Sequence, residues 1–71
     1  MIRRGNLVKS KNANEAGFDV GLVVSQIYPT LVVRSGPNSV SESHEVLVVD
    51  VLSKGQIYTN ILIDSIEILE A

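Results

Sequence analysis

Apolar residues occur in short runs along this chain, and polar or turn-forming residues separate the runs. The runs are rich in valine, isoleucine and leucine, which suit the pleated, half-buried surface of a β-strand. Residues 62–65 fit a single 3₁₀-like turn, and the polar segments 10–17 and 35–44 predict loops. The pattern predicts an all-β fold, with strands over residues 6–9, 18–27, 31–34, 45–52, 56–61 and 66–69.

Glycine and proline positions indicate how these strands are joined. Gly55 lies in a hairpin turn over residues 53–56, where a positive φ is needed. Gly21 lies inside a predicted strand, which is typical of a bulge or of a tight bend at a barrel corner. Pro29 has no N–H for a ladder and is expected at a turn, an edge or a bulge. Short strands and tight turns favour a small barrel or sandwich.

The 71 residues correspond to one domain, and a chain of this length buries only about 60% of its unfolded surface. Small domains usually compensate with disulfides, a metal or an oligomeric interface. Cysteine is absent and His44 is the single histidine, which excludes disulfides and disfavours a structural zinc site. The stability must therefore come from the core or from a neighbouring subunit.

Catalytic chemistry finds little support in the sequence. His44 lies near Ser41 and Ser43 in a predicted loop, but sequence adjacency does not make a catalytic triad, and we expect a solvated histidine. Asp50 interrupts an apolar run. It lies either on the solvent side of a bulged or edge segment, which we favour, or buried with a perturbed pKa or a partner. Glycine-rich phosphate loops are absent. We expect a non-enzymatic protein with no catalytic residues, cofactor or metal.

Common ligand-binding modes of small barrels are also disfavoured. Phe18, Tyr28 and Tyr58 are the only aromatic residues, too few for a polyproline groove or for stacking single-stranded nucleic acid. The net charge of −2 argues against a general duplex binder, although basic residues gather near the N-terminus.

Several motifs together resemble small SH3-like barrel proteins that are frequent among bacteriophages, notably marine and cyanobacterial ones. The similarity rests on an opening strand, a second strand, a central hairpin and a closing strand. These correspond to residues 5–9, 21–24, 46–58 with the Lys54–Gly55 turn, and 66–69. The resemblance implies a five- to six-strand SH3-like barrel spanning residues 1–71, with residues 28–44 as an extended insertion.

An SH3-like fold also implies that the first and last strands pair antiparallel. Arg3 and Arg4 are then expected near Glu70, and Lys9 near the start of the last strand, around Asp64. Opposite charges across paired strands cancel the local field, so we do not interpret the basic N-terminus as a DNA-binding surface.

The strand over residues 45–52 is apolar on both faces. Val46 and Val48 fall on one face, and Leu47, Val49 and Val51 on the other. A barrel core satisfies only the inward face, so the outward one needs a cover, either the 28–44 segment folded over the barrel or another subunit. The expected interface residues are Tyr28, Leu31, Val33, Val40, Val46, Val48 and Tyr58.

These features favour a virion assembly component, such as a capsid decoration (cement) subunit that binds itself or capsid subunits. We expect it in the virion or the host cytoplasm, not secreted and not in a membrane, because no apolar signal region or spanning run is present. The alternative is a phage-encoded regulatory adaptor for host protein or nucleic acid. Its basic contacts are expected to be Arg3, Arg4, Lys9, Lys11 and Arg34.

Overall fold

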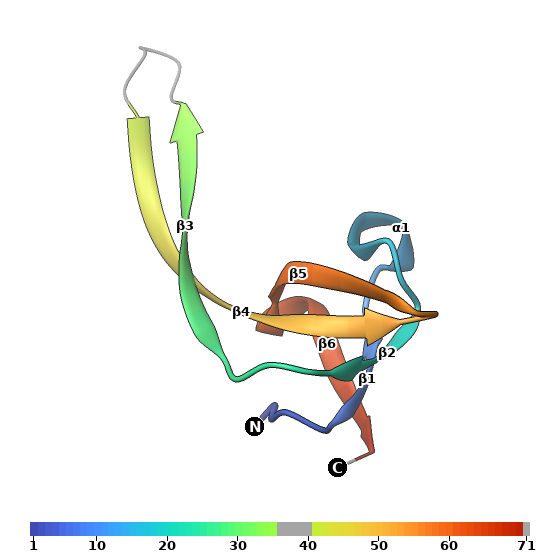
Figure 1. Ribbon diagram of the computed structural model, residues 1–71. Coiled ribbons are helices and arrows are strands. Elements are labelled where there is room, and N and C mark those ends of the chain that lie inside the picture. Colours follow the sequence, from blue (N-terminus) through green and yellow to red (C-terminus); the bar gives the residue numbers. More distant parts are fainter. Residues whose placement is uncertain (36–40, 71) are drawn as a thin grey trace.

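The computed structural model describes residues 1–35 and 41–70 and confirms the all-β class. A one-turn helix, α1 (Ala13–Ala16), interrupts the predicted 10–17 loop, and a 3₁₀ turn, η1 (Ile63–Ser65), lies where one was expected. Six strands form the rest of the fold (Figure 1). They are β1 (Leu7–Ser10), β2 (Val20–Val23), β3 (Tyr28–Ser35), β4 (Ser41–Ser53), β5 (Gln56–Leu62) and β6 (Ile66–Glu70).

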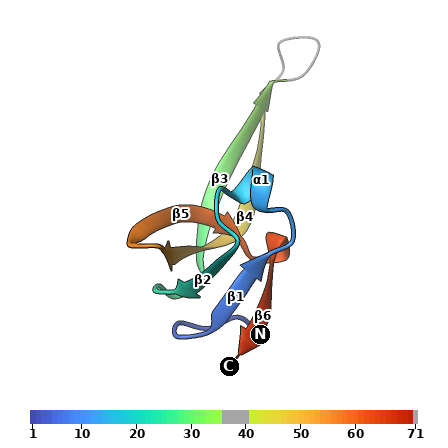
Figure 2. The ribbon, with the colours of Figure 1, turned by 90° about the vertical axis from the view of Figure 1, so that its right-hand side faces the viewer.

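The strands form one antiparallel sheet in the order β3-β4-β2-β1-β6, and β5 pairs with the other edge of β4. The sheet curls into a half-barrel (Figures 1 and 2). The antiparallel pairing of the first and last strands is confirmed, with Val8 opposite Ile68. The N- and C-termini therefore lie near each other.

The longest element is the β3–β4 hairpin, which projects away from the half-barrel (Figures 1 and 2). We call its described part, Tyr28–Ser35 together with residues 41–48, the arm. The 28–44 insertion is thus mostly strand in its described part, and it does not fold over the barrel. The predicted loop over residues 35–44 was wrong at its end, because β4 already begins at Ser41. The arm gives the molecule a radius of gyration of 13.4 Å, whereas a compact domain of this length has about 11 Å.

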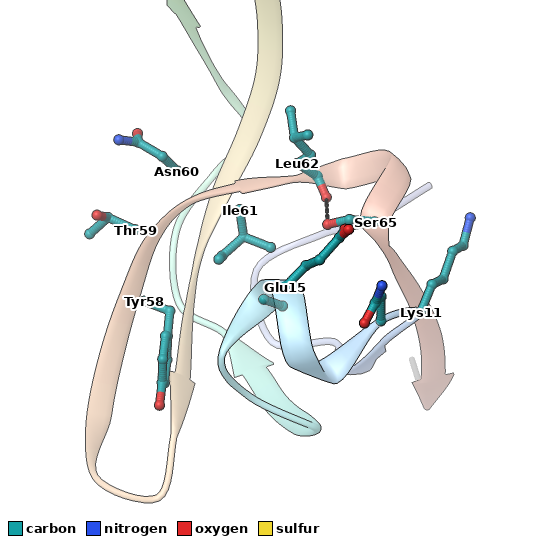
Figure 3. A pocket seen from close by; sticks show the side chains of 10 residues that line it. Lys11, Glu15, Tyr58, Thr59, Asn60, Ile61, Leu62 and Ser65 are labelled. Atoms are coloured by element: carbon teal, nitrogen blue, oxygen red, sulfur yellow. Dashed lines mark hydrogen bonds between the residues drawn. The ribbon is translucent and has the colours of Figure 1, made fainter. Parts of the chain in front are cut away.

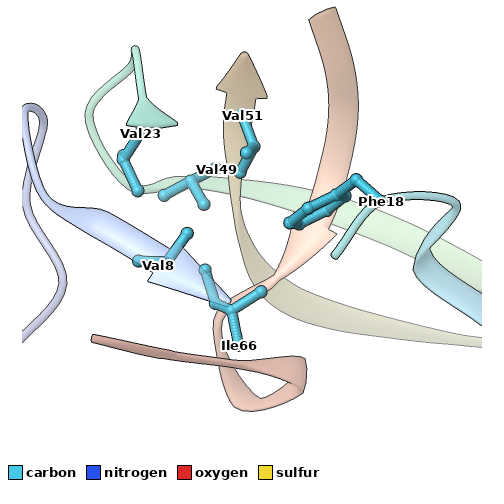
Figure 4. Packing of buried hydrophobic residues seen from close by; sticks show 6 residues of the cluster. All are labelled: Val8, Phe18, Val23, Val49, Val51 and Ile66. Carbon is cyan, nitrogen blue, oxygen red and sulfur yellow. The ribbon is translucent and has the colours of Figure 1, made fainter. Parts of the chain in front are cut away.

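The hydrophobic core lies inside the half-barrel (Figure 4). Its central members are valines from β1, β2 and β4, closed by Phe18 and by Ile66 at the start of β6. The rings of Phe18 and Tyr58 lie 5.3 Å apart and are tilted by 45°. This arrangement attaches β5 to the core from the side of α1.

Gly21 marks a close approach of two strands and not a bulge. It lies in regular register opposite Val8. A Cβ at this position would overlap Cγ1 of Val51 and lie 2.9 Å from the carbonyl oxygen of Leu52. Glycine is therefore required for β2 to pack this closely against β4.

The predicted 53–56 turn and the edge position of Pro29 are both confirmed. Lys54 and Gly55 have φ angles of 51° and 77°, as expected for a two-residue hairpin turn that matches the strand twist. Pro29 lies in β3, which pairs only with β4 among the described residues.

The predicted strand over 18–27 is wrong at both ends, because only Val20–Val23 joins the sheet.

Candidate interaction surface

One row of side chains along β4 runs from the core out onto the arm. Val51 and Val49 are fully buried and belong to the core. Leu47 lies two residues further along the strand and therefore on the same face. It is nevertheless 47% exposed. The row of β4 side chains that faces the core therefore extends beyond the core, and its outer part is exposed to solvent.

The paired strand β3 adds to this row. Residues directly opposite each other in an antiparallel pair share a face, and Pro29 lies opposite Leu47, Leu31 opposite Glu45, and Val33 opposite Ser43. Leu31 is 67% exposed and Val33 66%. We call the apolar set formed by Pro29, Leu31, Val33 and Leu47 the inner arm face.

The opposite face of the arm is better covered at its base than further out. Val48 is buried, Val46 is half-buried, and Val32 is exposed beside His44. The arm is thus a two-stranded ribbon with apolar side chains exposed on both faces. Two-stranded hairpins are only marginally stable in water without packing partners.

The predicted interface residues fall into different environments. Leu31 and Val33 are exposed on the inner arm face, and Val46 lies half-buried on the other face. Val48 is buried within the chain, and Val40 lies outside the described residues. Sequence reasoning missed Leu47, although its spacing from Val49 and Val51 signalled a shared row.

The two predicted tyrosines lie on the half-barrel side of the molecule. Tyr58 packs against the core, and its hydroxyl donates to Oε1 of Gln56 at 3.2 Å. Tyr28 lies at the base of the arm, where its hydroxyl donates to Oδ1 of Asp50 at 2.6 Å and accepts the backbone N–H of Asn60 at 3.2 Å. These contacts join β3, β4 and β5 where the arm leaves the half-barrel.

Asp50 lies at an irregularity between β4 and β5, as the favoured interpretation expected. It does not lie simply on the solvent side, because it is half-buried and its carboxylate accepts the hydroxyl of Tyr28. Val49 pairs with Ile61 and Val51 with Tyr58, so β5 carries one extra residue here. The backbone N–H of Asp50 donates to Oγ of Ser25 at 2.9 Å, and its carbonyl accepts the N–H of Val24 at 3.0 Å. Asp50 therefore fixes the segment that leads into the arm.

The pKa of Tyr28 is raised above its ordinary value by the hydrogen bond that its hydroxyl donates to Asp50. Partial desolvation and the negative charge of Asp50 act in the same direction, while the hydrogen bond from the backbone of Asn60 acts against them. The hydroxyl therefore keeps its proton at neutral pH, and the contact at the base of the arm is intact there.

A cavity of about 480 Å³ lies along β5, between α1 and η1 (Figure 3). Ala16, Tyr58 and Ile61 supply apolar walls, and Lys11 and Glu15 add charged side chains to the lining. The cavity follows consecutive residues of β5, from Tyr58 to Leu62. Such mixed, open lining offers no set of polar groups that converges on one point, as a specific small-molecule site usually does.

The basic residues are dispersed. Lys9 lies near the start of the last strand, as expected. It is opposite Glu67, and its Nζ is 3.4 Å from a carboxylate oxygen of Glu67, so the ion-pair partner is Glu67 and not Asp64. Arg3 and Arg4 are exposed beside Met1 and Ile68, and among the described residues they form no ion pair with Glu70. Lys11 lies at the β5 cavity. Arg34 belongs to β3, at the far end of the arm from these residues.

Within residues 1–35 and 41–70, no group of three or more His, Asp or Glu side chains is arranged to hold a metal ion. Neither helical segment in that part of the chain has the length or apolar content needed to cross a bilayer.

No protein-family model, curated protein or solved structure matches the chain.

Proposed function

We propose that this protein is a non-enzymatic assembly subunit that binds another protein through the inner arm face. The observation that carries the proposal is the exposure of Leu31, Val33 and Leu47 on a ribbon that projects from the half-barrel. Fully burying one such side chain stabilises a protein or complex by about 1.5–3 kcal/mol. Exposed apolar patches of this kind mark interaction sites on soluble proteins.

The setting we propose is a virion, with the chain as a capsid decoration subunit. The half-barrel with paired first and last strands supports an SH3-like fold, and the similarity of residues 5–9 and 66–69 to phage proteins of this type supports the virion. An adaptor that binds nucleic acid is less favoured. Arg3 and Arg4 are neighbours, but Lys11 lies at the β5 cavity and Arg34 belongs to β3 in the arm. Lys9 is already ion-paired with Glu67.

Sedimentation of native complexes tests this function. The tagged chain is expressed in its natural host, particles are separated on a density gradient, and the chain is quantified in each fraction by mass spectrometry. We expect the chain in the particle fractions at a fixed copy number. The double variant Leu31→Gln, Val33→Gln should remain with free protein at the top of the gradient.

Lys11→Gln is the matched control, because Lys11 is exposed and lies away from the arm. This control should sediment with the particles. The proposal is contradicted if the arm variant sediments like the unmodified chain, or if the unmodified chain is absent from every particle fraction.

A further inference from the structure

A second apolar surface lies on the outside of the half-barrel. Leu7 pairs with Leu22, Leu22 with Leu52, and Leu52 with Ile57, so these residues form a continuous row across β1, β2, β4 and β5. Their chain neighbours Val8, Val23 and Val51 are buried in the core, which places the row on the outer face. We call Leu7, Leu22, Leu52 and Ile57 the outer barrel row.

The outer barrel row is only partly shielded by its own chain. Ile57 is 60% exposed and Leu22 is also exposed, while Leu7 and Leu52 are half-buried. The chain thus carries two separate apolar surfaces without a cover. One is the inner arm face, and the other is the outer barrel row on the opposite side of the sheet.

The chain exposes more surface than a compact monomer of the same mass, and the excess is about one partner's share of a protein interface. The chain exposes 5174 Å². A compact monomer of 7.7 kDa exposes about 4300 Å², which is roughly 850 Å² less. Each partner in a standard protein interface buries about 800 Å². The excess therefore matches the area that one chain buries in a single contact with a second protein.

On the assembly function proposed above, we infer that the partner is a second copy of this chain, whose outer barrel row receives the inner arm face. One kind of contact then covers both apolar surfaces. Because the two surfaces differ, the contact is head-to-tail: each copy inserts its arm on one neighbour and receives an arm from another. Repetition of such a contact produces a ring or a filament.

Charge favours this arrangement over the packing of one arm against another. Glu45 lies opposite Leu31, on the same side of the arm as the inner arm face, and it is the charged residue on that side in the described part of the arm. Two arms packed face to face would bring two Glu45 carboxylates together, which is unfavourable. On the outer surface, Lys54 is exposed in the turn that follows Leu52 and precedes Ile57. An arm on this surface can place Glu45 near a positive charge.

Mixing two defective variants tests the inference. The arm variant is Leu31→Gln with Val33→Gln, and the barrel variant is Leu22→Gln with Ile57→Gln. All four side chains are exposed in the single chain, so both variants should keep the fold, which circular dichroism checks. Sedimentation velocity measures the assembly state. We expect the unmodified chain to form species larger than a dimer as its concentration rises.

Each variant alone should self-associate about 100-fold more weakly than the unmodified chain, because two buried apolar side chains are lost. A one-to-one mixture should form a dimer of about twice the 7.7 kDa chain mass, since each variant supplies the surface that the other lacks. A barrel variant that still dimerises alone would overturn the inference in favour of arm-to-arm packing. A mixture that stays monomeric would also overturn it.

A charge exchange keeps the inference testable if either double variant fails to fold. Glu45→Lys or Lys54→Glu alone should weaken association, and the two changes in one chain should restore it. An unmodified chain that is monomeric at every concentration overturns self-association but leaves the proposed function standing, because the gradient experiment on native particles tests that function separately.

Discussion

Gly21→Ala is expected to destabilise the protein strongly and to lower the urea midpoint of unfolding. The added Cβ would overlap Cγ1 of Val51 and lie 2.9 Å from the carbonyl oxygen of Leu52. The side chain of Val51 is fully buried and β-branched, so it has little freedom to move away. Overpacking of this kind costs about 1–3 kcal/mol or more. A domain of 71 residues is stable by only roughly 4–10 kcal/mol in total.

Urea denaturation followed by circular dichroism measures this effect. Gly55→Asn is the control, because Gly55 has a φ of 77° in a turn with no atom within 4 Å of an added Cβ. Asparagine tolerates that conformation, so the control should unfold near the midpoint of the unmodified chain. A Gly21→Ala midpoint that equals the control's would contradict the close packing of β2 on β4.

Phe18→Ala is the second large effect. Phe18 is buried in the core and contacts the ring of Tyr58, so its truncation leaves a cavity between β5 and the rest of the half-barrel. Truncations of this kind cost about 3–5 kcal/mol. That loss is a large part of the total stability of so small a domain. We expect the urea midpoint to fall steeply with an unchanged slope of the transition.

Phe18→Leu is the matched control, because it keeps an apolar side chain in the site and should cost less than about 1.5 kcal/mol. Equal losses for the two substitutions would contradict the packing of the Phe18 ring in the core.

Three strands of the half-barrel, β1, β5 and β6, were predictable from their apolar residues, whereas β2 was predicted too long at both ends. In β1 and β5, glycine and polar residues mark the start of each strand, and the predicted limits lie within one residue of the observed ones. The start of β4 was not predictable from the same signal. Ser41 and Ser43 pair with β3 through the backbone, and a ladder of backbone hydrogen bonds does not require apolar side chains.

The candidate surface was predictable only in part. Alternation along β4 shows that Leu47 shares a face with Val49 and Val51. It does not show where the cover of that face ends, because Phe18, Val8 and Ile66 supply the cover from distant parts of the chain. The bond from Tyr28 to Asp50 joins residues that are 22 positions apart, and no local pattern marks it.

The central claim is that the inner arm face is open to water in the single chain and covered in the assembly. A fluorophore at one site measures this directly, because the chain has no cysteine of its own. Val33→Cys carries a polarity-sensitive dye, and Lys11→Cys carries it as the control. We expect a water-like spectrum from both in dilute protein, and a blue shift in assembled particles for residue 33 alone. A blue-shifted spectrum for residue 33 in the dilute monomer, or none in the assembly, would contradict the account.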